Sequence, residues 1–382
     1  MSSFAVPIKR IRAIEPHPNA DAIELALIDG YRSIIKKGEF RQGDLIAYLP
    51  EAAILPEWLL KQLQFWDSEK GRGKLNGKQG NRVNAIRLRG ELSQGLCYPL
   101  LTDSSGNHLL VTEEVPDGVV VQESDNVVDE LGIIKYEPPI PVSMAGELFS
   151  VDQRLTLSFD VENWKSYPDI LQAGEEVIFT EKLHGTCTVL AILPYQEAQA
   201  EAFGERKNIL VFSKGLGAKG LVLKNNEQNR NNLYVRATQA LRERIDVLQI
   251  ADAELTAPIF ILGETFGAGV QDLNYGKSLD FRVFAVVKGY RENQTYCNWT
   301  QVEGELKTQF GFETVPVVYR GPFSVSLMLE YTNGQTTLEA NHIREGIVIV
   351  PAQERRDFRI GRVCLKSVSA DYLTRKGGTE YN

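Results

Sequence analysis

The stretch from Thr180 to Thr186 (TEKLHGT) limits how this part of the chain can fold. The residues before it (174–179, GEEVIF) alternate like a strand that enters from a turn, and the residues after it (188–193, TVLAIL) continue as a second strand. Lys182 is therefore expected at a strand end or in a tight turn. Gly185 would let another backbone or a ligand come close to it.

A lysine in such a position becomes a nucleophile when its ammonium loses a proton. Burial and nearby positive charge both lower the pKa of a lysine toward neutrality. An isolated K-x-x-G pattern is more often an exposed lysine in a hairpin, so the rest of the chain has to decide between the two interpretations.

Five further motifs follow in order: FSKG at 212–215, ILGE at 261–264, FRVF at 281–284, REGIVI at 344–349 and VCLKS at 363–367. With TEKLHGT, this order resembles the covalent nucleotidyltransferases, which are the ATP-dependent DNA ligases, the RNA ligases and the mRNA-capping guanylyltransferases. The E-K-x-H-G-T form is similar to the RNA-ligase branch. Each motif alone is weak, and only their order makes the resemblance specific.

The resemblance implies a role for each motif. Lys182 would attack the α-phosphorus of ATP and form lysyl-AMP, and Lys366 would contact the α-phosphate. Glu345 would organise Mg²⁺ or Mn²⁺ together with Glu264. Phe284 would stack on the base. The other implied nucleotide-binding residues are Glu181, Leu183, Gly185, Thr186 and Lys214. Attack on a nucleotide phosphorus needs a neutral amine, and we expect the charges of Lys366 and Lys214 to lower the pKa of Lys182.

Three positions depart from the family pattern. His184 replaces the aspartate of K-x-D-G, as in some RNA ligases. Cys364 stands where the last motif often has a first lysine, which leaves Lys366, with Arg362 as a candidate helper. Ala285 follows Phe284 where related ligases often have aspartate.

The N-terminal third reads as a β-rich module. Asp29-Gly30 between two alternating runs predicts a hairpin, residues 42–50 predict another strand, and residues 56–65 a short helix. The run PHPNADAIELALIDG resembles the OB-fold module that is also found as tRNA-binding domains. OB folds bind nucleic acid on an open barrel face, although packing or subunit contacts remain an alternative use.

Three prolines in residues 138–141 stiffen the chain and cannot continue a sheet. We therefore expect two domains, an OB-fold module over 1–140 and a nucleotidyltransferase domain over 141–382. The second domain is strand-rich with one long helix over Arg230–Gln249, so the predicted class is α+β.

The net charge of −8 alone argues against a nucleic-acid binder. A local patch decides binding, however, and residues 70–90 carry seven lysines and arginines without an acidic residue. The candidate RNA contacts in it are Lys74, Lys78, Arg87 and Arg89. A solvated surface loop is the alternative.

No apolar run reaches the ~18–20 residues of a membrane helix, no signal peptide opens the chain, and the four cysteines are far apart. A soluble, cytoplasmic protein without a disulfide framework fits these features, and we expect a monomer.

The N-terminal OB module, FDVEN at 159–163, EKLHGT and GVQDLNYG at 269–276 together resemble the Deinococcus-type RNA ligases. That resemblance implies ATP-dependent sealing of 3′-OH/5′-phosphate nicks in duplexes, including RNA/DNA hybrids, whose 3′-OH side is RNA, and so a role in RNA repair. The alternatives are a non-catalytic RNA- or tRNA-binding protein and another nucleotidyltransferase such as a guanylyltransferase.

Overall fold

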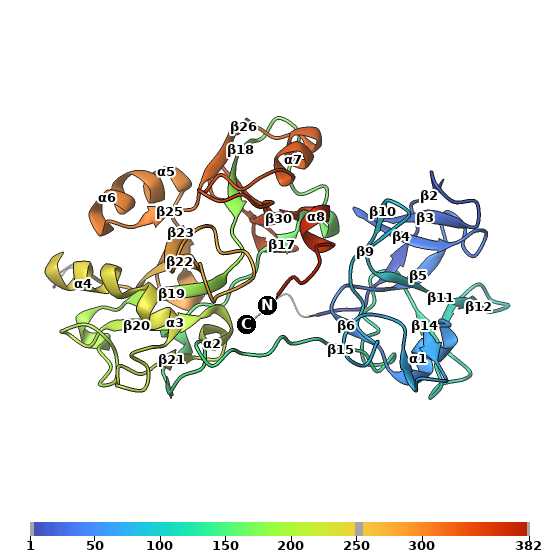
Figure 1. Ribbon diagram of the computed structural model, residues 1–382, viewed down its shortest axis with the longest axis horizontal. Helices are drawn as coiled ribbons and strands as arrows, with labels where there is room; N and C mark the ends of the chain where they lie inside the picture. Colours follow the sequence, from blue (N-terminus) through green and yellow to red (C-terminus); the bar gives the residue numbers. More distant parts are fainter. Residues whose placement is uncertain (1–3, 249–254, 380–382) are drawn as a thin grey trace. The chain divides into compact units, whose positions relative to one another are not determined.

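The computed structural model describes residues 4–248 and 255–379, which form two compact units (Figure 1). The first unit contains residues 4–137 together with the short segment Trp164–Pro168. The second unit contains Pro138–Asn163 and residues 169–379. The chain therefore passes out of the first unit after Glu137, returns for five residues, and leaves again.

The first unit is a β-rich module with one short α-helix. Its strands are β1 (Ile8–Arg10), β2 (Ala13–Pro16), β3 (Ile23–Ile28), β4 (Tyr31–Lys36), β5 (Leu45–Leu49), β6 (Ala53–Ile54), β7 (Trp66–Asp67), β8 (Arg72–Gly73), β9 (Ile86–Leu88), β10 (Glu91–Ser93), β11 (Leu96–Pro99), β12 (Leu101–Thr102), β13 (His108–Leu110), β14 (Val119–Val121) and β15 (Ile134–Lys135). The helix α1 (Glu57–Gln62) lies inside the range that the sequence predicts, and Trp164–Ser166 form a 3₁₀ turn.

Strand β5 is the central strand of a three-stranded sheet in this unit, between β1 and β11. All five of its residues are buried, because alternate side chains enter two different apolar clusters. The predicted hairpin is confirmed: β3 and β4 pair around Asp29, whose φ of 51° fits the left-handed conformation that such tight turns require.

The second unit is built on two antiparallel-rich sheets. The five-stranded sheet has the order β17 (Glu162–Asn163), β30 (Leu365–Val368), β27 (Gly346–Pro351), β18 (Glu176–Lys182) and β26 (Val317–Pro322). The six-stranded sheet has the order β20 (Ile209–Ser213), β19 (Thr186–Ile192), β22 (Ile259–Phe266), β23 (Asp280–Lys288) and β24 (Thr295–Tyr296), with β25 (Glu313–Thr314) also on β23. Strands β18 and β19 follow one another in sequence but belong to different sheets.

The other elements of this unit are short. They are β16 (Leu148–Ser150), β21 (Leu221–Leu223), β28 (Arg356–Asp357), β29 (Gly361–Arg362), α2 (Lys214–Ala218), α3 (Leu233–Ala237), α4 (Gln239–Leu248), α5 (Trp299–Gln301), α6 (Lys307–Phe310), α7 (Val325–Thr332), α8 (Ala370–Leu373), 3₁₀ turns at Gln153–Leu155, Tyr195–Glu197 and Arg291–Asn293, and a π-helical turn at Val302–Leu306.

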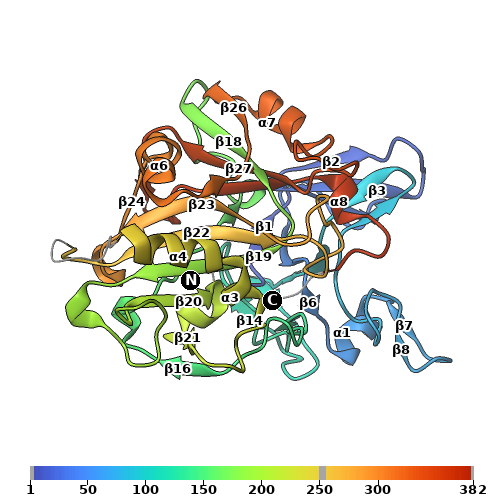
Figure 2. The same ribbon diagram turned by 60° about the vertical axis from the view of Figure 1, so that its left-hand side comes forward.

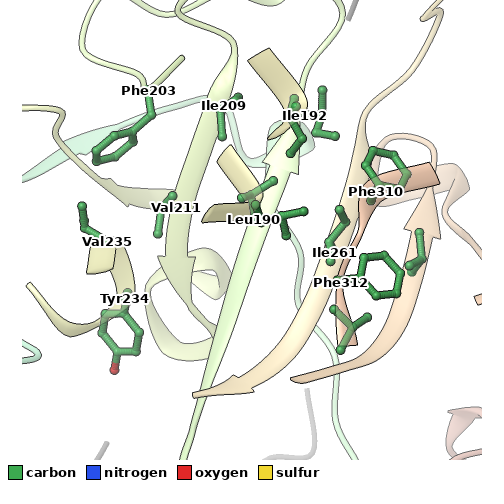
Figure 3. Packing of buried hydrophobic residues seen from close by; sticks show 14 of the residues in the cluster. Leu190, Ile192, Phe203, Ile209, Val211, Tyr234, Val235, Ile261, Phe310 and Phe312 are labelled. Atoms are coloured by element: carbon green, nitrogen blue, oxygen red, sulfur yellow. The ribbon is translucent and has the colours of Figure 1, made fainter. Parts of the chain in front are cut away.

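The six-stranded sheet is buried on both faces. Leu190 and Ile192 of β19 face α3, α4 and α6 in the cluster drawn in Figure 3, whereas Val189 and Ala191 enter a second cluster on the other face. Figure 2 shows α3 and α4 lying across β19, β20 and β22. Burial on both faces explains why these strands read as almost continuous apolar runs.

The single helix predicted over Arg230–Gln249 is wrong. Two helices form, α3 and α4, because Thr238 ends the first one. Its hydroxyl donates to the carbonyl oxygen of Tyr234 (2.9 Å), a side chain-to-backbone bond that accompanies the break. Gln249 lies outside the described residues. Among the helices of the described part of the chain, none combines the length and the apolar character that crossing a membrane requires.

Candidate active site

Lys182 is the last residue of β18, as the sequence predicts, and the turn Leu183–Gly185 carries the chain from one sheet to the other. Gly185 has to be a glycine there. A Cβ at this position would lie 2.2 Å from the carbonyl oxygen of Thr265, a backbone atom of β22. The close approach of the turn to β22 brings the end of one sheet against the other.

Glu345 immediately precedes β27, and Gly346 pairs with Lys182 across β18 and β27. Its carboxylate oxygen Oε1 lies 2.7 Å from Nζ of Lys182, and both groups are largely buried, with side chains 8% and 26% exposed. The other oxygen, Oε2, is buried without a hydrogen-bond partner in the described structure.

The expectation of a lowered pKa for Lys182 is wrong for the chain by itself. Burial does lower this pKa, but the carboxylates of Glu345 and Glu264 outweigh burial and raise it above the ordinary value for lysine. The motifs place cations near Lys182, but the carboxylates of Glu345 and Glu264 determine the direction of its pKa shift.

Glu264 lies on β22, next to the turn that Gly185 makes. Burial, opposed by Lys182 and reinforced by Glu345, raises its pKa to about 8. A carboxyl group whose pKa is raised this far marks a site where charge is concentrated in a poorly solvated place.

Lys366 of β30 belongs to the same electrostatic cluster. Burial, together with the positive charges of Lys182 and Lys214, lowers the pKa of Lys366. Lys214 begins α2, and its ammonium lies 2.6 Å from the Oδ1 atom of Asp160 and over the ring of Phe159. The structure thus brings Lys182, Glu345, Glu264, Lys366 and Lys214 together, although the sequence places them up to 184 residues apart.

Two phenylalanines lie beside this cluster. The ring centroids of Phe284, on β23, and Phe159 are 6.4 Å apart and tilted by 53°. Thr186 is buried, and its hydroxyl oxygen lies 3.1 Å from that of Tyr234. The ring of Phe159 also lies under the ammonium of Lys214, so this aromatic pair borders one cation of the cluster.

Two of the predicted nucleotide-binding residues direct their side chains elsewhere. The buried Glu181 carboxylate accepts hydrogen bonds from Thr336 and from the backbone and hydroxyl of Thr337, at 2.5–2.8 Å. Leu183 packs in an apolar cluster with Tyr275. Alternation along β18 explains this, because Glu181 and Lys182 face opposite sides of the strand. The carboxylate of Glu181 and the side chain of Leu183 thus both have partners within the protein.

Arg362, the candidate helper of Lys366, is occupied by other partners. Its guanidinium pairs with Glu354 (2.5 Å) and lies 3.8 Å from the ring centre of Tyr296. Cys364 is buried in the core cluster that includes Leu183. Of Arg362, Cys364 and Lys366, it is therefore Lys366 that takes part in the cluster around Lys182.

His184 has the densest set of contacts in the turn. Its Nε2 atom lies 2.8 Å from Oδ1 of Asp272, and its Nδ1 atom lies 2.8 Å from the hydroxyl of Tyr372. Its backbone N–H donates to the hydroxyl of Tyr275 (2.6 Å). Burial, despite the neighbouring carboxylates of Glu345 and Asp272, lowers the pKa of His184.

Four of these side chains have no role in the predictions from the sequence: Asp160, Asp272, Tyr275 and Tyr372. Two of the motifs that carried the resemblance, FDVEN and GVQDLNYG, contain Asp160, Asp272 and Tyr275. Those motifs could have identified these three residues as candidates for the site. Tyr372 lies in no such motif, and only the fold places it against His184.

The residues present fit a divalent metal that completes its shell with phosphate oxygens. Glu345 offers a buried oxygen without a partner, and Glu264 is adjacent. Among residues 4–248 and 255–379, no group of three or more metal-ligating side chains occurs. Mg²⁺ commonly binds through one or two carboxylates plus substrate phosphates, so two glutamates agree with this mode.

The candidate RNA contacts lie in the first unit. Arg87 is on β9 and Arg89 in the turn that follows it; their guanidinium groups donate to the carbonyl oxygens of Gly90 (3.2 Å) and Asn19 (3.3 Å). Lys74 and Lys78 lie in the glycine-rich segment after β8, and all four residues are exposed.

Comparison with known families and structures agrees with this arrangement. A family model described as RNA ligase matches residues 175–368, which is more than half of the chain. An OB-fold domain model matches residues 5–100. A comparison with curated protein sequences finds no significant relative.

Solved structures of Naegleria gruberi RNA ligase share the fold of the whole chain. A lysine-to-alanine mutant with ATP and Mn is 23% identical, with a TM-score of 0.71 over 96% of this chain and 97% of that one. A glutamate-to-alanine mutant with AMP and Mn gives 23% identity, the same coverage and a TM-score of 0.72. The enzyme with PPi is 24% identical with a TM-score of 0.71, again over 96% and 97% of the two chains.

The fold is thus that of a nucleotidyltransferase with an N-terminal OB-fold domain, and the predicted α+β class and OB fold are confirmed. The chain belongs to the RNA ligase family.

Proposed function

We propose that this chain joins RNA ends through a lysyl-AMP intermediate formed on Lys182. The observation that supports it is the assembly of Lys182, Glu345, Glu264 and Lys366 at the junction of the two sheets. In the first step, Nζ of Lys182, after losing a proton, attacks the α-phosphorus of ATP. A P–N bond forms, the bond to the β-phosphate oxygen breaks, and pyrophosphate leaves in line.

Two further transfers complete the reaction. The terminal 5′-phosphate of an RNA strand attacks the phosphorus of lysyl-AMP, which breaks the P–N bond and leaves AMP linked to the RNA 5′-phosphate. The 3′-hydroxyl of the other strand then attacks that 5′-phosphate. A phosphodiester bond forms, the hydroxyl proton is released and AMP leaves.

The cationic side chains of the site have distinct roles in this proposal. Lys366 lies within the field of Lys182, and it would hold the α-phosphate and stabilise charge in the transition state. Lys214 would bind the nucleotide after it exchanges its contact with Asp160. Phe284 would stack on the adenine, and the hydroxyl of Thr186 would bond near the sugar.

Glu345 and Glu264 would hold Mg²⁺ or Mn²⁺, which supplies charge neutralisation for the phosphates when it is bound. Glu345 also has a direct effect on the nucleophile. Its 2.7 Å contact orients Nζ of Lys182 and favours the ammonium form. Both carboxylates therefore have to be offset by positive charge before the amine can attack.

The substrate proposal is more specific. The position of the OB-fold domain before the ligase domain and the motifs FDVEN and GVQDLNYG support the Deinococcus-type branch. We therefore propose sealing of nicks in duplexes, RNA or RNA/DNA hybrids, with RNA on the 3′-OH side, in RNA repair. Arg87, Arg89, Lys74 and Lys78 would contact phosphates of the duplex. We also propose that the domain boundary near residue 140 separates the part of the chain that binds RNA from the part that is adenylated.

We also propose that the protein is a monomer and that it works in the cytoplasm. All four cysteines, Cys97, Cys187, Cys297 and Cys364, are free thiols, which fits a reducing compartment. Size-exclusion chromatography with light scattering would test the monomer, and a mass of twice the 42.8 kDa of one chain would contradict it.

The proposal is tested by incubating the protein with α-labelled ATP and a divalent metal and following covalent label. Label is expected on the wild type and on Lys219→Ala, which changes an exposed lysine near α2, and none on Lys182→Ala. Absence of label on the wild type, or label retained without Lys182, would exclude the mechanism.

Two additional measurements define the substrates. Unlabelled ATP should compete for labelling far better than GTP, whereas the reverse order would indicate a guanylyltransferase. A nick-sealing assay with RNA or DNA on each side of the break should show a requirement for RNA on the 3′-OH side. Salt-sensitive RNA binding without any adenylation would instead support a non-catalytic binding protein.

A further inference from the structure

A network of side chains joins the segment Ser369–Thr379 to the turn that follows Lys182. Five residues outside the turn form it: Gln271, Asp272, Tyr372, Arg375 and Thr379. We call these five residues the clasp. Asp272 is its centre, because its carboxylate contacts His184 of the turn, Arg375 and Thr379.

The contacts of Asp272 saturate its carboxylate. Oδ1 lies 2.8 Å from Nε2 of His184, and Arg375 contacts both oxygens, at 2.8 Å and 2.9 Å. The backbone N–H of Thr379 donates to Oδ1 (2.8 Å), and the N–H of Asp272 donates back to the hydroxyl of Thr379 (2.9 Å). Bidentate, charge-assisted contacts of this kind fix geometry better than single bonds do.

The clasp reaches the turn at two points besides Asp272. The hydroxyl of Tyr372 lies 2.8 Å from Nδ1 of His184, so both ring nitrogens have a partner. The side-chain amide of Gln271 donates to the carbonyl oxygen of Gly185 (3.2 Å), and its oxygen accepts from the hydroxyl of Thr379 (3.0 Å). The guanidinium of Arg375 also lies over the ring of Tyr372, at 3.7 Å.

The same segment is connected to Glu345. The backbone N–H of Ser369 donates to the carbonyl oxygen of Glu345 (2.8 Å). Nδ1 of His184 lies 3.8 Å from Oε2 of Glu345, the oxygen that has no hydrogen-bond partner. With both ring nitrogens engaged by Asp272 and Tyr372, His184 is held beside this oxygen without bonding to it.

From these contacts we propose that the clasp positions the catalytic turn for adenylation. Asp272, Arg375 and Tyr372 are positioning residues that act through His184. They fix His184, and with it the direction of Lys182 and the free oxygen of Glu345. The proposal deepens the proposed function and rests on it, because a misplaced nucleophile matters only if Lys182 is adenylated.

The experiment measures single-turnover adenylation of Lys182 with α-labelled ATP, with rates expressed per folded protein. Arg375→Gln removes the bidentate contact, and Tyr372→Phe keeps the ring and removes only the hydroxyl at Nδ1 of His184. Arg359→Gln is the matched control, because Arg359 makes a similar double contact with Asp169 in the same unit.

The maximal rate should fall ~10-fold or more in Arg375→Gln and ~3-fold in Tyr372→Phe. The ATP concentration that gives the half-maximal rate should stay unchanged in both variants. Arg375→Lys should recover part of the rate, because it restores the charge with fewer donors. Arg359→Gln should behave as the wild type. Melting temperatures are recorded for all variants, and if Arg375→Gln does not fold, Tyr372→Phe decides.

The results separate the two levels of the proposal. No adenylation of the wild type would defeat the proposed function itself. A wild type that labels normally, with unchanged maximal rates in Arg375→Gln and Tyr372→Phe, would overturn the clasp alone. A higher ATP requirement at full maximal rate would also overturn it, because the clasp would then belong to nucleotide binding.

Discussion

The Oδ1 atom of Asp160 lies 2.6 Å from the ammonium of Lys214, although 54 residues separate them. In the proposed mechanism Lys214 binds the nucleotide, so the phosphates of ATP compete with this carboxylate for the same ammonium. Asp160→Asn should therefore lower the ATP concentration for half-maximal adenylation, by ~2- to 5-fold for a partly exposed pair. Rates of covalent labelling over a range of ATP concentrations measure this half-maximal concentration.

Lys214→Met serves as the opposite control for that prediction, since removal of the ammonium should raise the ATP requirement. An increase in both variants would mean that Asp160 supports nucleotide binding directly.

Gly185→Ala should abolish adenylation. Its Cβ would lie 2.2 Å from the backbone oxygen of Thr265, which β22 holds in place, so the turn itself would have to move. We expect a loss of ~100-fold or more in labelling and a destabilisation of about 1–3 kcal/mol. Gly304→Ala is the control, because a Cβ there meets no atom within 4 Å. Wild-type labelling by Gly185→Ala would show that the turn is not constrained.

Glu264 should make the free energy of unfolding depend on pH. Its pKa is raised to about 8 in the folded chain, from the ordinary 4.5, so the folded state binds more protons between these values. Stability should therefore fall as pH rises from about 4.5 to about 8, and should not change further above that range on account of this group. Denaturant titrations in the presence of a chelator measure the effect.

Glu264→Gln should flatten that part of the stability curve, since glutamine cannot ionise. A mutant curve as steep as that of the wild type would show that other groups cause the dependence.

Reversing the charges of Arg87 and Arg89 to glutamate should weaken binding of a nicked duplex and reduce its salt dependence, because phosphate contacts are lost. Adenylation of Lys182 should be unaffected, since these residues belong to the first unit. Lys135→Glu, at an exposed position of the same unit outside the patch, is the control. Equal losses of RNA binding and of adenylation would contradict this division of roles.

The sequence predicted those parts of the molecule that local pattern controls. Alternation and turn residues placed Lys182 at a strand end and the Asp29 hairpin at its position. That Glu345, Glu264 and Lys366 share one site with Lys182 was implied by the family resemblance that the order of the motifs carries. Local pattern could not show that β18 and β19 enter different sheets. The alternation of apolar residues identifies a strand but not the sheet to which that strand belongs.

Two errors have the same physical origin. The pKa of Lys182 depends on which charges lie nearest, and the 2.7 Å contact with Glu345 arises from the pairing of β18 with β27. The break at Thr238 depends on a side-chain hydroxyl that competes for a backbone carbonyl. Periodicity carries no information about either. The contacts of Tyr372 with His184 and of Arg375 with Asp272 likewise depend on tertiary structure alone.

The return of Trp164–Pro168 to the first unit affects how the two halves of this enzyme can be separated. The amide of Gly30 donates to the carbonyl oxygen of Lys165 (2.8 Å), and the hydroxyls of Tyr31 and Ser166 lie 2.9 Å apart. A fragment that stops at Glu137 would lack these partners. The OB-fold domain and the ligase domain are therefore interlaced along the polypeptide, and an exchange of either domain between related ligases has to transfer these five residues with the OB fold.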